Sequence, residues 1–343
     1  MSTLSFAVTA ARCTGCGACT SLAPGVFVVR ERLCHVARQP SELELPSSEA
    51  ALLNCPAYAI RASAQESVLQ ETPPTTPPAE EVYPSLILES EAVRWALADL
   101  PWSTLTPSLA PPALRALVRE MAFYEQTTYS ATARFMQAFY DDVDFSQWLA
   151  VWFYEETRHP HALITWLRRL GETIDDAFVL RGRVSSPFMK SLTGTLVTNV
   201  ISEVTASHAY HRLSALSDEP VLKAIARCLA TDEARHAAGF FLFARKRLAR
   251  SPNPARDTLD SLKVLHLWLN GSDNVTHPIN QLLQRLSRGD DGANAKSELR
   301  LDLDKIRLRV TRLVGILLGL PLRQPQDVLP QLETLVSNNQ SPK

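Results

Sequence analysis

The sequence predicts two domains of different class: a small α+β domain, followed by an all-α helical bundle with extra helices at its C-terminal end. Three features of the 343 residues support this prediction. Five of the six cysteines lie within the first 55 residues, a proline-rich stretch follows them, and apolar residues then recur every three or four positions. We therefore assign residues 1–68 to the first domain, 69–84 to a linker and 85–335 to the bundle.

Short strands and loops are expected in the first domain. A strand is predicted at residues 4–9, a hairpin at 26–37, and a short helix that leads into Cys55 and Pro56. Glycines stand between the first cysteines, where a tight loop would place several thiols close together.

The spacing of four cysteines indicates an iron–sulfur cluster. Cys13, Cys16 and Cys19 are each separated by two residues, and Cys55 is followed by proline. This pattern resembles the bacterial ferredoxins, in which three closely spaced thiolates and a distant Cys-Pro bind clusters. Only one such run is present, so the resemblance implies one cluster, and four thiolates favour [4Fe–4S] over a three-iron cluster.

The alternatives for these cysteines are a zinc site and a disulfide framework. A zinc ribbon pairs two Cys-x-x-Cys knuckles, and no second knuckle follows. A cluster also implies a reducing compartment, where structural disulfides are rare. Cys34 and Cys228 are expected to be ordinary strand or buried thiols.

Residues 70–84, QETPPTTPPAEEVYP, are too rich in proline to form a helix. Such a stretch behaves as a semi-rigid extended spacer. It therefore marks the boundary between the two domains.

Two similar five-residue strings are the most informative feature of the bundle. Residues 155–159 read Glu-Glu-Thr-Arg-His, and residues 232–236 read Asp-Glu-Ala-Arg-His. In a helix, Glu-x-x-His places a carboxylate and an imidazole on one face, where both can bind one metal. A single copy would more often be a surface acid and a core histidine, but two matching copies are hard to obtain by chance.

Each string has a glutamate at a similar distance upstream. Glu125 precedes Glu156 by 31 positions, and Glu203 precedes Glu233 by 30. Both upstream glutamates fall on apolar helical stripes, where an unpaired carboxylate would be costly and a bound cation would remove the cost. Glu120 is an alternative to Glu125, although it lies off the stripe.

Apolar periodicity predicts four helices that carry these residues and three more after them. The apolar pattern of the four ligand-bearing helices covers residues 114–139, 148–166, 196–213 and 222–243. The pattern of the three later helices covers residues 259–269, 279–286 and 301–318. We expect the last three to cover the bundle or to form the face of a homodimer.

One glutamate from each of two helices plus Glu-x-x-His from each of two others resembles the ligand set of ferritin-like di-iron oxidoreductases. Within this group the two strings, with Trp148 and Trp152 before the first, are most similar to the soluble acyl-acyl-carrier-protein desaturases. The resemblance covers roughly residues 113–250. It implies two iron ions, O2 as co-substrate, and oxidation of an unactivated position with electrons from the fused ferredoxin domain.

The resemblance also implies roles for individual residues. Glu156 and Glu233 would bridge the irons, Glu125 and Glu203 would be terminal ligands, and His159 and His236 would each bind one iron. Glu155 and Asp232 lie one turn before these histidines and are expected to orient the imidazoles rather than bind metal. Arg158 and Arg235 would pair with these acids at i,i+3.

Two departures leave the reaction open. The desaturases have a threonine one turn after the third-helix glutamate, whereas this chain has Ala206 there and Thr205 one position earlier. Arylamine N-oxygenases carry an extra histidine where this chain has Leu229, which disfavours N-oxygenation. A ferritin-like or rubrerythrin-like protein that stores iron or reduces peroxide is the remaining alternative.

Composition and charge suggest the partners. A formal net charge of −1 argues against nucleic acid, and neither a leader nor a membrane-spanning apolar run is apparent, so a cytoplasmic location is expected. An NAD(P)H-dependent ferredoxin reductase or a flavodoxin would supply electrons. The cations Arg245, Lys246, Arg247 and Arg250 could dock an acyl carrier protein, or they could form a solvated helix face.

Overall fold

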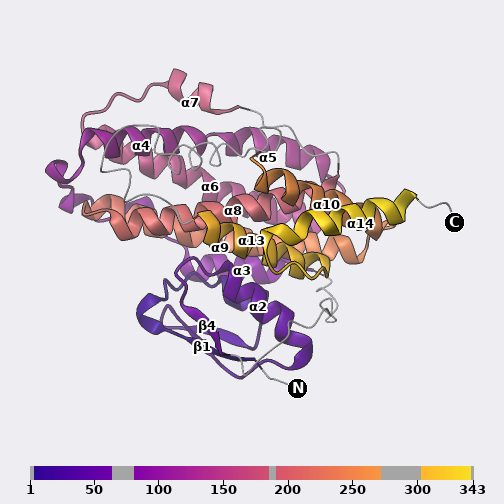
Figure 1. Cartoon of the computed structure of the whole chain (residues 1–343). Helices are drawn as coiled ribbons and strands as arrows, with labels where there is room; N and C mark the ends of the chain where they lie inside the picture. Colours follow the sequence, from indigo (N-terminus) through magenta and orange to yellow (C-terminus); the bar gives the residue numbers. More distant parts are fainter. Residues whose placement is uncertain (1–3, 64–80, 185–190, 272–302, 341–343) are drawn as a thin grey trace.

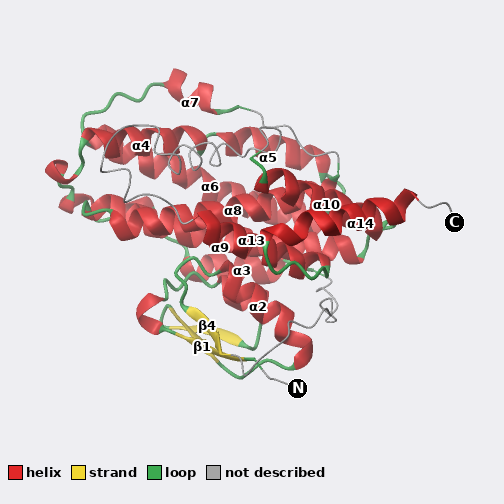
Figure 2. Ribbon diagram, viewed as in Figure 1, coloured by secondary structure: helices red, strands yellow, loops and turns green. Residues whose placement is uncertain are grey.

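The computed structural model describes residues 4–63, 81–184, 191–271 and 303–340. A small N-terminal part with strands lies against a larger, mostly helical body (Figures 1 and 2). Among the described residues, no helix combines the length and apolar character needed to cross a bilayer.

The small part contains two antiparallel two-stranded sheets. β1 (Ser5–Val8) pairs with β4 (Ile60–Ser63), and β2 (Phe27–Arg30) pairs with β3 (Leu33–Val36). The predicted opening strand and hairpin are therefore present. The two-residue turn between β2 and β3 has positive φ angles, 50° and 61°, which suit the right-handed twist of a hairpin.

Two helices complete this part. α1 (Ala18–Leu22) follows the cysteine loop, and α2 (Leu45–Asn54) is the predicted helix that leads to Cys55. Phe6 and Phe27 are buried and meet edge to face with ring centroids 6.1 Å apart, so a small apolar core joins the two sheets.

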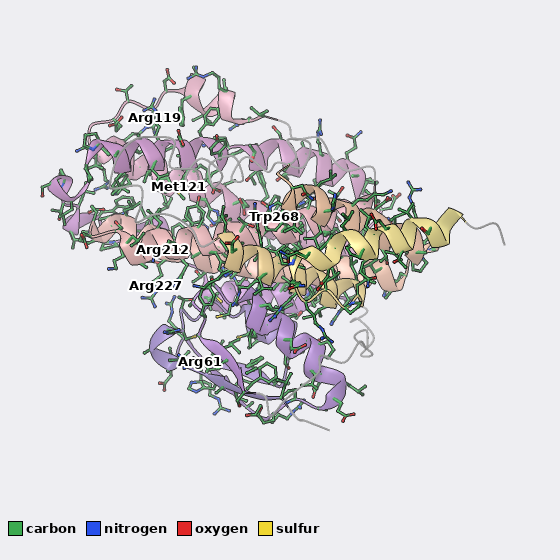
Figure 3. The ribbon with its side chains drawn as sticks, in the orientation of Figure 1. Arg61, Arg119, Met121, Arg212, Arg227 and Trp268 are labelled. Atoms are coloured by element: carbon green, nitrogen blue, oxygen red, sulfur yellow. The ribbon has the colours of Figure 1, made fainter. Side chains whose placement is uncertain are left out.

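The helical body is built around long helices that pack side by side. α4 and α5 pack on α6, α6 packs on α9, and α9 packs on α8. Side chains fill the space between them (Figure 3). The bounds are Pro112–Tyr124 for α4, Thr127–Ala138 for α5, Val143–Arg169 for α6, Leu192–Leu216 for α8 and Pro220–Ala249 for α9.

Side-chain caps begin three of these helices. Asp142 accepts a hydrogen bond from Phe145 N at the start of α6, and Ser191 accepts one from Gly194 N at the start of α8. Glu219 caps α9 and also accepts from Trp166 Nε1 at 2.7 Å. This carboxylate therefore ties the start of α9 to α6.

The first ligand-bearing helix is not continuous, contrary to the prediction of one helix over residues 114–139. α4 ends at Tyr124, and Glu125 and Gln126 form a turn before α5 begins. α7 (Asp176–Gly182) packs against this turn so closely that a Cβ on Gly182 would lie 2.6 Å from Phe123 O. The turn therefore lies in the contact with α7, and neither proline nor glycine marks it in the sequence.

Further helices surround the body. α10 (Pro254–Leu269) packs on α8, and α13 (Leu303–Leu318) packs on α2 and α8, so both cover the bundle as expected. The helix predicted at 279–286 lies outside the described residues. α3 (Tyr83–Val93) begins within the predicted linker, most of which is also outside them, and α14 (Val328–Gln340) was not predicted.

The small part rests on the side of the body formed by α3, α9 and α13 (Figure 1). Asn54 Nδ2 donates to Ala234 O at 2.8 Å, where it joins the end of α2 to the middle of α9. Arg309 on α13 donates to Leu53 O at 2.9 Å and to Cys55 O at 3.1 Å. The cysteine-bearing loop is thereby held directly over α9.

Candidate metal centres

The cysteines of the small part line one cavity beneath the β2–β3 hairpin. Gly15 and Gly17 have φ angles of 71° and 82°, which bend the loop around this cavity. A Cβ on Gly15 would lie 2.2 Å from Arg32 O, so only glycine allows the loop to approach the hairpin turn this closely. The thiols that line the cavity are those of Cys13, Cys16, Cys19, Cys34 and Cys55.

Backbone amides already point at the sulfurs. Cys13 Sγ accepts from Gly15 N at 3.4 Å and from Cys34 N at 3.3 Å, and Cys55 Sγ accepts from Ala59 N at 3.4 Å. Such N–H···S bonds stabilise thiolates that bind a cluster. Burial raises the pKa of the Cys16 thiol to about 12, a cost that iron binding offsets because it deprotonates the thiol.

Cys34 is a buried strand thiol, as predicted, but it has a partner that the sequence did not suggest. It is buried, and its Sγ lies 3.2 Å from Cys19 Sγ in the same cavity. The reason is the hairpin register, which pairs Cys34 with Val29 and turns its side chain inward while His35 is exposed. Cys228 is half-buried on α9 and does not line the cavity.

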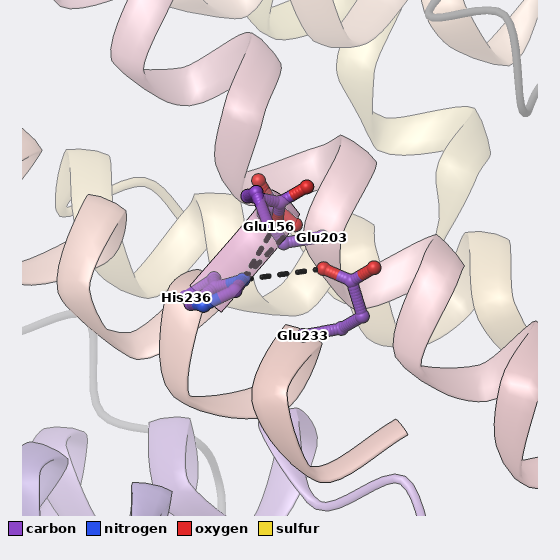
Figure 4. A group of neighbouring side chains, drawn as sticks. All are labelled: Glu156, Glu203, Glu233 and His236. Atoms are coloured by element: carbon purple, nitrogen blue, oxygen red, sulfur yellow. Dashed lines mark hydrogen bonds and ion pairs between the residues drawn. The ribbon is translucent and has the colours of Figure 1, made fainter. Parts of the chain in front are cut away.

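The six predicted ligands of the bundle meet in its interior, and all are buried. Glu156, Glu203, Glu233 and His236 form one group whose ligand atoms lie within 4.8 Å of one another (Figure 4). Glu125, His159 and Glu233 form a second group of the same kind, so Glu233 belongs to both. Glu120, the alternative to Glu125, is half-buried and belongs to neither.

The donor set fits a pair of cations. His159 Nδ1 and Glu156 Oε1 are buried without a hydrogen-bond partner among the described residues. His236 Nδ1 lies 2.9 Å from Glu156 Oε1 without hydrogen-bond geometry, as two ligands of a shared ion approach each other. Four carboxylates and two imidazoles are the donors that iron takes in such sites.

The pKa values show how costly this cluster is without cations. Burial raises the pKa of Glu125 to about 7 although the nearby His159 lowers it, and burial together with the charge of Glu233 raises the pKa of Glu203 well above its usual value. Burial alone would lower the pKa of His236, but its contacts with Glu155, Glu156 and Glu233 raise it strongly. Protons or metal ions must therefore neutralise the carboxylates.

Glu155 and Asp232 each contact the histidine of the other string, whereas the prediction expected each acid to orient the histidine one turn after it. Asp232 Oδ2 lies 3.2 Å from His159 Nε2, and Glu155 Oε2 lies 3.0 Å from His236 Nε2. Each acid therefore contacts the histidine of the other helix. This crossing directs both Nε2 atoms to acids and leaves both Nδ1 atoms facing the carboxylate cluster.

The two arginines join these acids into one network. Arg235 Nη2 pairs with Asp232 Oδ1, and Arg158 Nη2 lies 3.5 Å from Glu155 Oε1, as the i,i+3 spacing predicted. Each arginine also reaches across, Arg235 to Glu155 at 3.4 Å and Arg158 to Asp232 at 3.6 Å.

Sequence reasoning missed several polar partners of the site. Trp95 Nε1 donates to Asp232 Oδ2 at 2.8 Å, and Ser90 donates to Glu155. Tyr210 donates to Glu125, and Thr128 Oγ1 donates to Glu156 Oε2 at 3.0 Å. Tyr210 stands two turns after Glu203 on the same apolar stripe, a signal that could have identified it; Ser90 and Trp95 lie outside the four helices and carried none.

The cation run of α9 is engaged within the chain. Lys246 pairs with Asp144, Arg245 Nη1 donates to Ser47 Oγ at 3.2 Å, and the Arg247 guanidinium lies over the Phe139 ring. Lys246 is also buried. These contacts give the run a structural role and do not support it as a docking face for an acidic carrier.

Comparison with known proteins bears on the small part. Residues 8–62 match the family of the 4Fe-4S single cluster domain of Ferredoxin I. The small part is therefore a single-cluster ferredoxin-type domain, and the four predicted cysteines lie within it. Searches of curated proteins and of solved structures find no match to the chain.

Proposed function

We propose that the chain is an O2-dependent di-iron oxidoreductase of the desaturase or oxygenase type, whose ferredoxin domain supplies electrons to the helical body. One observation carries this proposal. A buried site of four carboxylates and two imidazoles lies directly beneath a domain built to hold a redox cluster, and the two are joined through α9. A storage protein has no need of such a junction.

The ligands would divide between two ions. Glu125, His159 and Glu233 would hold one ion, and Glu156, Glu203, Glu233 and His236 would hold the other, so Glu233 belongs to both groups. An iron pair bound here would supply the activation of O2, which requires two electrons from outside the site. Because a [4Fe–4S] cluster passes single electrons, two successive transfers are required for each turnover.

The chain's own groups would order and protonate this site. Asp232 and Glu155 hold Nε2 of each histidine, which fixes the tautomer that presents Nδ1 to a metal. The Tyr210 hydroxyl donates a hydrogen bond to Glu125 Oε1, and the Thr128 hydroxyl donates one to Glu156 Oε2, so each places a proton beside a carboxylate. Thr205 donates to Ile201 O of its own helix at 2.6 Å, so Thr128 rather than Thr205 is the threonine whose hydroxyl contacts a carboxylate of the site.

The overall reaction class balances with one organic substrate. O2, two electrons and two protons, together with a substrate that carries C–H or N–H bonds, give either two waters and a new double bond or one water and an oxygenated product. The electrons would enter the cluster from an NAD(P)H-dependent ferredoxin reductase or a flavodoxin.

The test begins with metal content under anaerobic conditions. The protein should contain about six irons and about four labile sulfides per chain, the content of one [4Fe–4S] cluster and one iron pair. Cys16→Ala should remove the cluster signal and leave the iron pair, and Glu156→Ala should do the reverse. Simultaneous loss of both centres in each variant would contradict this division of ligands.

Oxygen chemistry is tested with the loaded protein and a chemical or enzymatic reductant. We expect reduced protein to consume O2 and to couple this consumption to an organic molecule drawn from a cell extract, identified by mass spectrometry. Rapid turnover of peroxide without any organic substrate, or loading of iron far beyond two ions in the body, would favour a peroxide-reducing or storage protein instead.

A further inference from the structure

The two halves of the carboxylate site repeat each other in sequence, yet the ferredoxin domain contacts them unequally. Residues 155–159 lie on α6 and residues 232–236 on α9. α1 of the ferredoxin domain packs on α9, and Asn54, next to the ligand Cys55, donates to Ala234 O within the second string. The domain is therefore seated on the His236 half.

Arg235 spans the distance between the two centres. Its Nη1 donates to Cys16 O at 3.5 Å, and its Nη2 donates to Glu155 Oε1 at 3.4 Å. The other oxygen of that carboxylate, Glu155 Oε2, lies 3.0 Å from His236 Nε2. Arg235 Nη2 also donates to Asp232 Oδ1, and Asp232 Oδ2 lies 3.2 Å from His159 Nε2. Polar contacts through Arg235 thus connect the backbone of a cluster ligand with both imidazoles of the metal site, and every side chain in these series is buried.

Arg158 occupies the matching position in the other string but has different surroundings. Its Nη1 donates to Trp95 O, and its guanidinium lies 4.9 Å from the Trp95 ring and 5.3 Å from the Tyr154 ring. Tyr154 is exposed, and Arg158 lines an open surface groove with it. The same residue type in the same repeat therefore faces the groove in one copy and the cluster loop in the other.

We infer that electrons pass from the cluster to the metal site by way of Arg235, the positioning residue that connects the Cys16 loop through Glu155 to His236 and through Asp232 to His159. This inference rests on the proposed function. Electron tunnelling weakens steeply with distance and is aided by continuous bonded contact, and this series supplies the contact. The buried positive charge of Arg235, close to the cluster loop, also favours the reduced cluster, which carries one more negative charge.

The experiment uses the full chain with both centres loaded. The cluster is reduced anaerobically by one equivalent of dithionite while the iron pair is oxidised, and its reoxidation is followed by stopped-flow absorbance and by freeze-quench EPR. Arg235→Gln should slow this internal transfer by roughly tenfold or more, as loss of partners just outside metal ligands commonly does, and Arg235→Lys should slow it less. The matched Arg158→Gln variant also removes contacts with Glu155 and Asp232 but none with the Cys16 loop, so it should slow the transfer less than Arg235→Gln does.

A second measurement does not depend on the iron pair. Potentiometric titration of the cluster should show a lower reduction potential in Arg235→Gln than in the unmodified protein. The potential should change little in Arg235→Lys, which keeps the positive charge, and little in Arg158→Gln. Because this readout needs only the ferredoxin domain to hold its cluster, it tests the contact of Arg235 with the Cys16 loop even if Arg235→Gln loads iron poorly in the body.

Each outcome has one reading. Equal slowing in the Arg235 and Arg158 variants, or transfer at the normal rate in Arg235→Gln, would overturn the assigned route. If the unmodified protein holds both centres but its reduced cluster never reduces the iron pair, the proposed function itself fails. That failure is seen without any variant and is therefore distinguishable from failure of the route.

Discussion

Glu155 Oε2 lies 3.0 Å from Nε2 of His236, a residue of another helix, although Glu155 stands only four positions before His159 in its own helix. The reciprocal contact joins Asp232 of α9 to His159 of α6 at 3.2 Å. The two Glu-x-x-His helices therefore exchange their outer acids. The site is consequently a single interlocked unit, and neither helix can form its half alone.

The crossing predicts which pairs of residues are coupled. Glu155→Gln should weaken metal affinity by about 10–100-fold, and so should Asp232→Asn, because each leaves an imidazole poorly oriented. In double-mutant cycles on metal affinity, Glu155→Gln should couple to His236→Ala and add independently to His159→Ala. The measurement is calorimetric or spectroscopic titration of the metal-free body with Co2+ or Fe2+. Stronger coupling within each string than between the strings would contradict the crossed arrangement.

The fifth thiol predicts an unequal response among the cluster cysteines. Because Cys34 Sγ lies 3.2 Å from Cys19 Sγ, Cys19→Ser should retain a cluster, with Cys34 replacing the lost thiolate. Cys16→Ala should lose it, and Cys19→Ser combined with Cys34→Ser should lose it as well. Iron, sulfide and EPR measurements on anaerobically purified protein decide the matter. Retention of the cluster by the double variant would show that Cys34 is not the replacement.

Removal of the metal ions should make stability depend on pH between about 5 and 7. Burial raises the folded-state pKa of Glu125 from 4.5 to about 7, so its contribution to stability is present below the unfolded value and is lost as pH rises through the folded value. The free energy of unfolding of metal-free protein should therefore fall over this range, measured by urea denaturation. Glu125→Gln should reduce the slope, because the amide does not titrate. A slope unchanged by this substitution would assign the dependence to other groups.

Metal loading should remove much of that dependence and raise the free energy of unfolding. Binding only to the folded state contributes about 2.7 kcal/mol per site at one hundred times the dissociation constant. A rise in the thermal midpoint with added Fe2+ under anaerobic conditions checks this. The Glu156→Ala variant serves as the control and should respond weakly. Equal responses by the two proteins would place the bound iron elsewhere.

Arg309 should hold the ferredoxin domain in place. Besides its bonds to the carbonyls of Leu53 and Cys55, its guanidinium lies 4.4 Å from the Tyr58 ring, which meets buried His208 edge to face. Arg309→Ala should cost about 1.5–3 kcal/mol, the range for hydrogen bonds from a charged donor. It should also slow internal electron transfer, because the cluster loop loses its fixed seat on α9.

Arg312, one turn later on α13, supplies the control for that substitution. It donates to Arg323 O at 2.9 Å in an exposed contact, so Arg312→Ala should change stability by less than about 0.5 kcal/mol. Denaturation curves followed by the visible absorbance of the cluster compare the two variants. If both variants match the unmodified protein in stability and transfer rate, Arg309 is not what seats the domain.

The sequence by itself determined the parts of this protein that depend on local spacing. Glu156 and His159, like Glu233 and His236, share a helix face because they are three residues apart, and Cys13, Cys16 and Cys19 fall on one tight loop for a similar reason. The β2–β3 hairpin and the ranges of α6, α8 and α9 also followed from short-range pattern. Each of these features is set by interactions within a few residues of the chain.

Tertiary structure alone decided the rest, because those features depend on which distant segments pack together. The interruption at Glu125 lies where Gly182 approaches closely, and the place of Cys34 beside Cys19 comes from the fold of the hairpin over the cysteine loop. The crossed contacts of Glu155 and Asp232 depend on the relative rotation of α6 and α9, and the bridge from Arg235 to Cys16 depends on where an entire domain docks. No local pattern encodes such relations, since helices with the same apolar stripe can pack at several rotations and offsets.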